Sequence, residues 1–330
     1  MDLRTSYLGL DLANPFMPGA SPLVDDLDIV RRLEDAGAAA IVMHSLFEEQ
    51  ITRERARTAY DLEAHLEAFS EASSFFPRPE EFRLGPDEYL EHIRRIKQAV
   101  SVPVIASLNG VTPTGWLDYA QLIEQSGADA LELNVYHVAT DPEDDAGAVE
   151  RRLIEVVEMV RRAVRIPLAV KLSPFYTSLP SMARALERAG AQGVILFNRF
   201  YQPDIDPDAL EVVSRIKLST SSELLLRIRW LAVLAGRSGL DLGCSGGVHT
   251  ARDAIKAIMA GATAVQTVSM LLKRGPGHLA VLLRDTREWF EQHEYESLNQ
   301  ARGSMSLARC PNPAAFERGN YVRILQGWSD

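Results

Sequence analysis

A repeating pattern of small, apolar and polar positions organises this chain. Four segments begin with a small residue and Gly-Ala and continue into an apolar run that ends in polar residues: AGAAAIVMHS (36–45), SGADALELNV (126–135), AGAQGVILFN (189–198) and AGATAVQTVS (260–269). Each follows an amphipathic stretch, so its glycine is predicted to end a helix in the left-handed conformation. The apolar run after the glycine predicts a parallel strand that is buried on both faces.

Segments of a second kind lie between these repeats. They are SVPVIASLNG (101–110), RIPLAVKLSP (165–174), GLDLGCSGG (239–247) and, near the start of the chain, NPFMPGAS (14–21). In the first two, a proline lies at or just before the start of the strand, where no ladder hydrogen bond is lost. All four are predicted to be further buried strands.

Strands and helices are predicted to alternate along the chain. Strands are expected near 15–20, 39–44, 102–107, 129–134, 167–172, 193–198, 240–244 and 263–267, and helices over 25–36, 87–99, 116–126, 146–164, 179–189, 222–236, 250–260 and 276–291. Strict alternation predicts a parallel sheet, and eight such units favour a closed barrel. An open, doubly wound sheet would carry an early G-x-G-x-x-G turn, which this sequence lacks. The predicted fold class is α/β, a single (β/α)8 TIM barrel.

Two regions do not fit a bare barrel. Residues 46–86 form a charged insertion after the second strand, which is predicted to be either a surface helix and loop or a lid over the active site. Residues 292–330 form a C-terminal tail whose apolar residues suggest packing against the barrel or a second subunit. A length of 330 residues alone suggests about two domains at roughly 150 residues each. The repeat instead predicts one domain over 1–330 with these two additions.

Composition and charge narrow the range of partners. Apolar residues make up 46% and charged residues 24%, as in ordinary globular enzymes. A formal net charge of −10 argues against nucleic acid or an anionic membrane as partner. No stretch approaches the roughly 18 apolar residues of a membrane span, and no secretory signal is recognised. The two cysteines, Cys244 and Cys310, lie far apart, which predicts no disulfide framework and a reducing, cytoplasmic location.

Candidate site residues follow from the barrel, because the carboxyl ends of its strands surround the active site. Polar or small residues end the otherwise apolar runs there: Ala20, Ser21, His44, Ser45, Ser107, Asn109, Asn134, Tyr136, His137, Lys171, Asn198, Arg199, Gly246, Gly247, Gln266 and Ser269. No spacing of histidines and carboxylates resembles a metal site, so no metal is expected.

The segment CSGGVHTARDAI predicts a phosphate site. It consists of a strand, a turn with Gly246 and Gly247, and the start of a helix, whose free N–H groups suit an anion. Ser269, after the eighth strand, could add a hydroxyl group. The alternative is a tight turn without a ligand.

Lys171 and two histidines are the candidates for chemistry. Lys171 is one of five lysines and ends the strand PLAVKL. Because burying an unpaired ammonium is costly, it is expected to face an anion or an electron-rich ring such as a flavin, or else a structural salt bridge. His44 and His137 also lie at strand ends, where they could carry protons or simply complete hydrogen bonds.

These residues together resemble the dihydroorotate dehydrogenase family of FMN-dependent barrels, over residues 5–300. The matching pieces are NPF…GAS, LELN, VKLSP, FN, SGGV…A…AGATAVQ and LNQARG. The resemblance implies FMN as cofactor, bound by Ala20, Ser21, Ser45, Asn109, Asn134, Lys171, Gly246, Gly247, Gln266 and Ser269. It also implies that Asn198 faces the substrate, and it is closer to the classes that lack a membrane-binding N-terminus.

Several of the positions that contact the substrate in this family carry different residues in this sequence. His44 replaces a lysine, FRLGPDEYL stands in place of an asparagine-rich loop, and His137 stands where the family has a catalytic cysteine or serine. Arg199 replaces a small hydroxyl residue beside Asn198. The substrate is therefore expected to be dihydroorotate or a related small anionic compound.

The leading hypothesis is an FMN-dependent oxidoreductase in which Asn134 and Asn198 hold the substrate while hydride passes to flavin N5. His137 takes the proton, with Tyr136 as a substitute, and His44 and Arg199 hold an anionic group. One alternative is a flavin-binding electron-relay or non-catalytic subunit. Another is a phosphate-binding barrel enzyme with Lys171 as a Schiff-base lysine. Electrons are expected to pass to a small oxidant or an electron-transfer partner, and a homodimer is expected.

Overall fold

The computed structural model describes residues 1–51, 85–110, 113–135, 137–199, 202–213, 217–316 and 318–327. Its centre is a parallel sheet of eight strands in the order β3-β12-β11-β8-β7-β6-β5-β4. The strands are β3 (Phe16–Pro18), β4 (Ile41–Phe47), β5 (Val104–Gly110), β6 (Ala130–Val135), β7 (Leu168–Leu172), β8 (Gly193–Leu196), β11 (Asp241–Ser245) and β12 (Ala264–Thr267). The two ends of the sheet approach each other, because the Ala39 N–H donates to the Phe16 carbonyl over 2.9 Å. The structure thus confirms the predicted (β/α)8 barrel.

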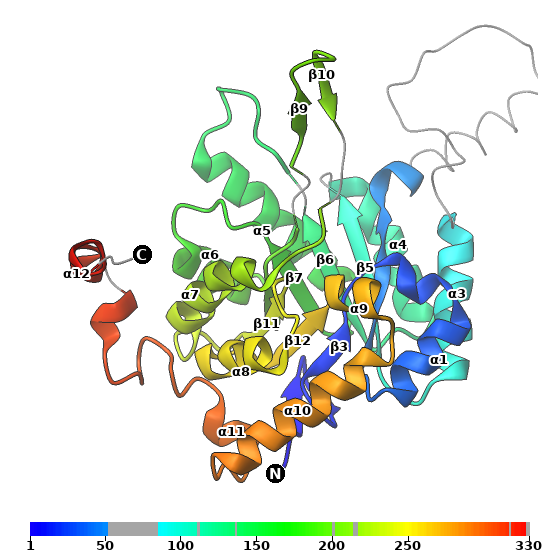
Figure 1. The fold of residues 1–330 in the computed structure, drawn as a ribbon. Coiled ribbons are helices and arrows are strands. Elements are labelled where there is room, and N and C mark those ends of the chain that lie inside the picture. Colours follow the sequence, from blue (N-terminus) through cyan, green and yellow to red (C-terminus); the bar gives the residue numbers. More distant parts are fainter. Residues whose placement is uncertain are drawn as a thin grey trace, which may run out of the picture.

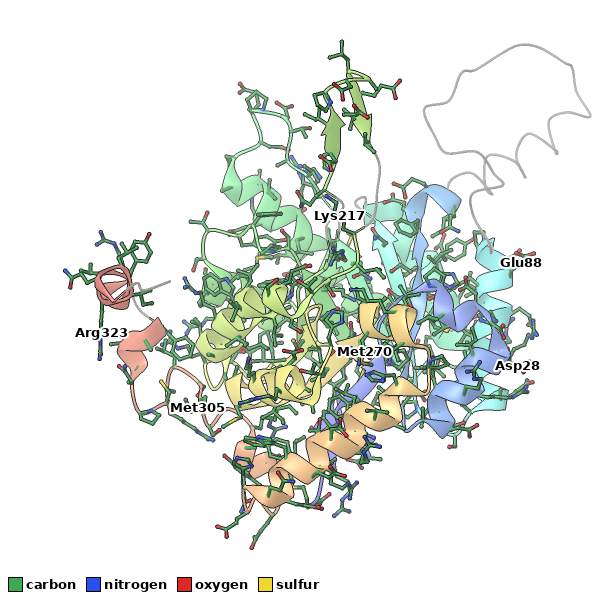
Figure 2. All side chains as sticks on the ribbon, in the orientation of Figure 1. Asp28, Glu88, Lys217, Met270, Met305 and Arg323 are labelled. Atoms are coloured by element: carbon green, nitrogen blue, oxygen red, sulfur yellow. The ribbon has the colours of Figure 1, made fainter. Side chains whose placement is uncertain are left out.

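A ring of helices surrounds the strands (Figure 1). It comprises α1 (Leu27–Asp35), α3 (Pro86–Ala99), α4 (Pro113–Gln125), α5 (Ala146–Ala163), α6 (Leu179–Arg188), α7 (Leu224–Leu234), α8 (Ala251–Ala260) and α10 (His278–Gln292). Each buries one apolar face against the strands, while residues such as Asp28 and Glu88 point outward (Figure 2). Several helices begin at a side chain that accepts a hydrogen bond from a free backbone N–H, as Asp145 does for α5 and Thr250 for α8.

The glycines of the Gly-Ala repeat end helices as predicted. Gly37, Gly127, Gly190 and Gly261 follow α1, α4, α6 and α8, with φ values of 95°, 91°, 98° and 131°. This region of φ is open to glycine at little cost, so the chain can turn sharply from each helix into the next strand.

The amino-terminal end of the barrel is closed by a hairpin of β1 (Thr5–Tyr7) and β2 (Leu10–Leu12). Tyr7 and Leu8 are buried in one cluster with barrel-lining residues such as Val42 and Ile195. The Leu8 N–H donates to the Asp241 carboxylate over 2.7 Å. Within the described part of the chain, the hairpin therefore covers this end of the barrel, opposite to the carboxyl ends of the strands.

The structure describes most of the C-terminal tail but little of the insertion after the second strand. Residues 52–84 of the insertion, including the segment expected to form a helix or lid, lie outside the described residues. The tail continues from α10 through α11 (Leu298–Ala301), and its Gly303 and Leu307 N–H groups donate to carbonyls of Ile258 and Ala232. The tail thus packs on the barrel up to this point. Beyond it, α12 (Gly319–Gln326) lies away from the barrel (Figure 1).

A second hairpin was not predicted. It consists of β9 (Asp204–Asp206) and β10 (Glu211–Val213) and projects beyond the strand ends (Figure 1). Its strands have three residues each, too few for a recognisable alternation of apolar and polar positions.

Candidate active site

Three neighbouring strands bring a polar cluster into the barrel mouth. Ser45, Ser107 and Asn134 lie near the ends of β4, β5 and β6. The two hydroxyl oxygens are 2.9 Å apart, and the Asn134 amide donates to Ser107 over 2.7 Å and to Ser45 over 3.1 Å. The Asn134 Oδ1 atom is buried and accepts no hydrogen bond from the described residues, and the same holds for the Ser21 hydroxyl. Buried polar atoms of this kind normally have partners, so they favour a bound ligand.

A second cluster joins β6, β7 and β12. The Lys171 ammonium donates to the Glu132 carboxylate over 2.9 Å and to the Gln266 carbonyl oxygen over 3.0 Å. The Gln266 amide in turn donates to Glu132 over 2.6 Å. All three side chains are buried, Glu132 with 1% of its surface exposed. Lys171 thus forms a structural salt bridge, and one of its three N–H donors remains for a ligand.

The predicted phosphate turn has a backbone that requires glycine. Gly246 and Gly247 have φ values of 88° and 83°. A Cβ atom on Gly247 would lie 2.5 Å from the Leu224 nitrogen, at the start of α7. The turn leads directly to Thr250, which begins α8.

Ser219 lies between the predicted phosphate ligands. Its N–H donates to the Ser269 hydroxyl over 3.0 Å, and its hydroxyl accepts from the Gly247 N–H over 3.4 Å. The Lys273 ammonium donates to the Ser219 carbonyl over 2.9 Å. The Ser219 hydroxyl oxygen also lies 3.1 Å from the Nε2 atom of His249, whose pKa is lowered by burial and by the charge of Lys273. These N–H donors are engaged with Ser219 and Ser269, and it is the positive charge of Lys273 beside the glycine turn that suits an anion.

His44 is held at the rim by two groups that sequence reasoning missed. Its Nδ1 atom is 2.6 Å from the Asp25 carboxylate, and its ring meets Tyr89 edge-on at 5.0 Å between ring centres. The Tyr89 hydroxyl donates to the Ser107 carbonyl and accepts from the Ser107 N–H, both over 3.0 Å. Burial raises the pKa of the Tyr89 phenol. Tyr89 thus connects His44 to the Ser107 cluster.

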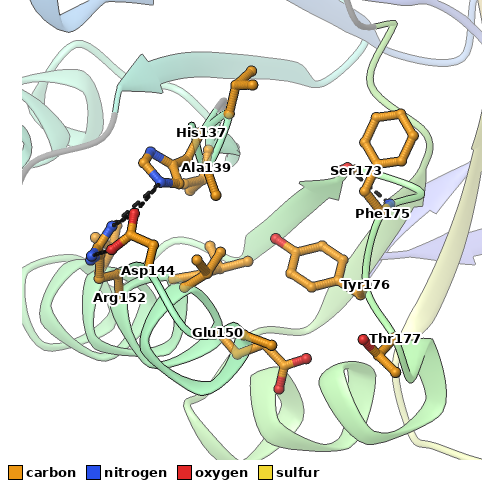
Figure 3. Close-up of a pocket in the computed structure, with 15 residues that line it drawn as sticks. His137, Ala139, Asp144, Glu150, Arg152, Ser173, Phe175, Tyr176 and Thr177 are labelled. Atoms are coloured by element: carbon orange, nitrogen blue, oxygen red, sulfur yellow. Dashed lines mark hydrogen bonds and ion pairs between the residues drawn. The ribbon is translucent and has the colours of Figure 1, made fainter. Parts of the chain in front are cut away.

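His137 lies apart from these clusters in the described structure. Its Nε2 atom is 3.6 Å from the Asp144 carboxylate and 3.3 Å from an Arg152 guanidinium nitrogen (Figure 3). Hydrogen bonds from Arg152 hold the pKa of Asp144 below its usual range. The substitute proton acceptor, Tyr136, lies outside the described residues.

Asn198 and Arg199 follow the sixth barrel strand, β8, which ends at Leu196. The Asn198 N–H donates to the Leu172 carbonyl over 2.8 Å. The Arg199 guanidinium forms an ion pair with Glu223 at 3.1 Å and also donates to the Lys217 carbonyl. Arg199 is therefore already paired with a carboxylate.

The remaining predicted residues also lie near strand ends. Asn109 pairs in register with Asn134 across β5 and β6, and Ala20 packs partly buried against the cluster inside the barrel. Among the described residues, no group of histidine, cysteine, aspartate and glutamate has the arrangement of a metal site.

Comparison with known proteins decides the family. The family model described as dihydroorotate dehydrogenase matches residues 82–288, which is more than half of the chain. The chain belongs to the dihydroorotate dehydrogenase family. It is therefore an oxidoreductase acting on CH–CH bonds, as its family is.

Individual relatives cover most of the chain. The catalytic subunit of dihydroorotate dehydrogenase B (NAD(+)) from Thermoplasma volcanium is 26% identical over 92% of this chain and 98% of its own length. The corresponding subunit from Citrifermentans bemidjiense is 30% identical over 68% of this chain and 75% of its own length. A chloroplastic dihydropyrimidine dehydrogenase (NADP(+)) from Arabidopsis thaliana is 24% identical over 92% of this chain and 76% of its own length.

Several residues of this candidate site were missed from the sequence: Asp25, Tyr89, Glu132, Asp144, Ser219 and Glu223. Glu132 had a usable signal, because a glutamate inside the apolar strand ALELNV needs a buried partner. Tyr89 lies in FRLGPDEYL, where from Pro86 onward the chain forms helix α3. Nothing in the local sequence indicates which distant residues Asp25 and Ser219 contact.

Proposed function

We propose that this chain is an FMN-dependent dehydrogenase that oxidises a small anionic dihydropyrimidine at a CH–CH bond. The observation that supports it best is the barrel mouth, where the unpartnered Asn134 Oδ1 atom and Ser21 hydroxyl lie near the strand ends together with the buried Lys171 ammonium. The printed names of the relatives, which include dihydroorotate and dihydropyrimidine dehydrogenases, support the substrate class.

The residues of the mouth and the glycine turn fit FMN. Gly246, Gly247 and Ser269 would hold its phosphate, in a turn where side chains are sterically excluded. Ser21, Ser45, Asn134 and Lys171 would contact the ring or the ribityl chain, with Ala20, Asn109 and Gln266 beside them. FMN would supply a hydride acceptor at this place.

Lys171 and Glu132 prepare the mouth for an electron-rich ring. The remaining N–H of the ammonium would donate to an oxygen or nitrogen of the ring, while Glu132 and Gln266 fix the direction of that donor. A cation held in this way favours negative charge on the ring.

The substrate residues are proposed as the sequence predicted them. Asn134 and Asn198 would hold the substrate, and His44 and Arg199 would hold its anionic group. His137 would take the proton, and Asp144 would stabilise the resulting imidazolium. Tyr136 is the alternative acceptor. Asp25 and Glu223 would orient His44 and Arg199 through the contacts described above.

The visible spectrum of the purified protein tests the cofactor. We expect a yellow protein with flavin absorption, and we expect Lys171→Ala to weaken flavin retention or reduction. Lys256→Ala, on the exposed face of α8, is the matched control and should retain flavin like the wild type. A colourless protein that stays colourless with added FMN would contradict the proposal.

Anaerobic mixing with dihydroorotate and with dihydrouracil tests the substrate. Bleaching of the flavin band by dihydroorotate supports the proposal. Bleaching by dihydrouracil alone, which has no carboxylate, would contradict an anionic substrate, and no bleaching with either excludes these two donors. The Lys171–Glu132 ion pair argues against the Schiff-base alternative, because a Schiff-base lysine must react as the neutral amine. Borohydride trapping with a carbonyl substrate should therefore label no lysine.

An electron-relay subunit is the second candidate function. It is favoured by the positions of His137 and Arg199, which both contact acidic partners. Such a protein would bind FMN and accept electrons from a reductant without bleaching by any dihydropyrimidine.

Assembly and location complete the proposal. We expect the chain to form a homodimer. We also expect it to pass electrons to a small oxidant or a partner protein, and a partner is supported by the names of relatives that are catalytic subunits. Light scattering of the purified chain measures the assembly. A cytoplasmic location is supported by Cys244 and Cys310, which are buried and form no disulfide. None of the described helices is both long and apolar enough to cross a membrane.

A further inference from the structure

A cavity of about 560 Å³ lies between helix α5 and the segment after strand β7. His137, Asp144 and Arg152 line one side, and Ser173 and Phe175 line the other (Figure 3). Its size is in the range of small-molecule sites. None of the residues proposed to bind FMN lines it, so it is distinct from the proposed FMN site, whereas His137, the proposed proton acceptor, does line it.

One wall of the cavity is apolar. Val149, Leu153 and Val156 recur at helical spacing along α5 and line the cavity. Phe175 lies at its edge with 73% of its surface exposed. A ligand with an apolar or aromatic body would bury these surfaces.

Two polar side chains of the cavity have no partner among the described residues. The Tyr176 hydroxyl points into the space, and the Glu150 carboxylate lies below the Tyr176 ring, on the side of Thr177 (Figure 3). Neither forms a hydrogen bond or ion pair within the described part of the chain. Burial and the charge of Glu150 raise the pKa of Tyr176 to about 12, so the phenol remains neutral.

The other charges of the cavity compensate each other. Asp144 and Arg152 form an ion pair, and their hydrogen bonds stabilise the charged form of both. Glu150 is left as an uncompensated negative charge beside an apolar wall.

We propose that this cavity binds an organic ammonium ion with an apolar or aromatic body. The ammonium donates hydrogen bonds to the Glu150 carboxylate and to the Tyr176 oxygen, and the ring of Tyr176 adds cation–π attraction. The body packs on the α5 wall and is covered by Phe175. The inference does not rest on the proposed function, but His137, the proton acceptor of that function, lines the same cavity.

Isothermal titration calorimetry on the full chain tests the site with three probes of similar shape. The probes are 2-phenylethylammonium, 2-phenylethanol and 3-phenylpropionate, which differ in charge. We expect the ammonium to bind more tightly than the other two. Glu150→Gln should weaken its binding about tenfold, the loss expected for a charge-assisted hydrogen bond. Tyr176→Phe should weaken it about threefold, as for a neutral one.

Glu155→Gln is the matched control, because Glu155 is exposed on the same helix and does not line the cavity. It should bind the ammonium as the wild type does. Equal binding of all three probes, no binding of the ammonium, or equal effects of the two glutamate variants would overturn the proposal. The titration requires neither flavin nor turnover, so its failure is distinguishable from failure of the proposed function.

Discussion

The ammonium of Lys171 is the most constrained charge of the barrel mouth. Of its two partners, Glu132 comes from the neighbouring strand β6, whereas Gln266 comes from β12, which β8 and β11 separate from β7 in the sheet. Removing one partner of a buried ion pair leaves the other charge without compensation, which is more costly than losing the pair as a whole.

Glu132→Gln should therefore destabilise the protein by roughly 3–5 kcal/mol, measured by urea unfolding. Asp28→Asn, which breaks an exposed pair with Arg31, is the control and should cost less than about 1 kcal/mol. The double variant Glu132→Gln/Lys171→Met should be more stable than Glu132→Gln. If it is not, charge imbalance is the wrong explanation.

Gly247 allows a second prediction at the residue scale. Gly247→Ala places a Cβ against the backbone of Leu224 and should abolish FMN retention in a spectral titration. Gly236→Ala is a matched control, because Gly236 has a similar φ of 74° but an open space of 4 Å around its Cβ position. It should cost about 1 kcal/mol of stability and retain FMN. Equal FMN retention by the two variants would disprove a steric role for Gly247.

Residue types at the mouth were readable from the sequence, but their partners were not. Lys171, Asn134 and Ser45 are polar residues at the ends of apolar runs, so their positions followed from the barrel. The acidic partners of His44 and Arg199 come from other β/α units, and only the folded chain brings them together. The bonding states of these side chains depend on those long-range contacts.

At the scale of elements, the helix-ending glycines carried most of the prediction. They mark where four helices stop, and the apolar runs after them mark the strands of a parallel sheet. The β9–β10 hairpin escaped prediction because its strands are short and exposed. The β1–β2 hairpin escaped because its strands also have only three residues each, although they are largely buried and close one end of the barrel.

Closure by the β1–β2 hairpin involves a titrating group. Burial raises the pKa of Asp241, which accepts the Leu8 N–H, above the ordinary value of 3.8. The folded chain then binds this proton more tightly than the unfolded chain does. The contribution of Asp241 to stability is present below pH 3.8 and is lost as the pH rises through the folded pKa.

Asp241→Asn should remove this dependence of the free energy of unfolding on pH, because the amide oxygen can still accept the hydrogen bond from the Leu8 N–H without carrying a charge. Urea unfolding at a series of pH values from acid to neutral measures it. Asp11→Asn, on the exposed position of β2, should keep the wild-type profile. A variant profile as steep as that of the wild type would assign the slope to other groups.

At the scale of the whole molecule, the chain is a barrel with a C-terminal extension that ends away from it. Helix α12 exposes Tyr321, Val322, Ile324 and Leu325 to solvent. Deleting residues 318–330 should leave the melting temperature within about 2 °C of wild type, because exposed terminal segments add little to stability. Differential scanning calorimetry measures this. A larger drop would mean that α12 packs against the barrel or a second subunit.

The pairing of Lys171 with Glu132 has a consequence for ionic strength. Because Glu132 offsets the charge of Lys171 beyond the reach of its remaining N–H donor, long-range attraction for an anionic cofactor comes from the phosphate end, where the exposed Lys273 contacts Ser219. Exposed charges are screened by salt, whereas buried ones are affected far less. Raising salt should therefore weaken cofactor affinity chiefly through Lys273, so the Lys273→Met variant should bind FMN with a flatter salt dependence than the wild type.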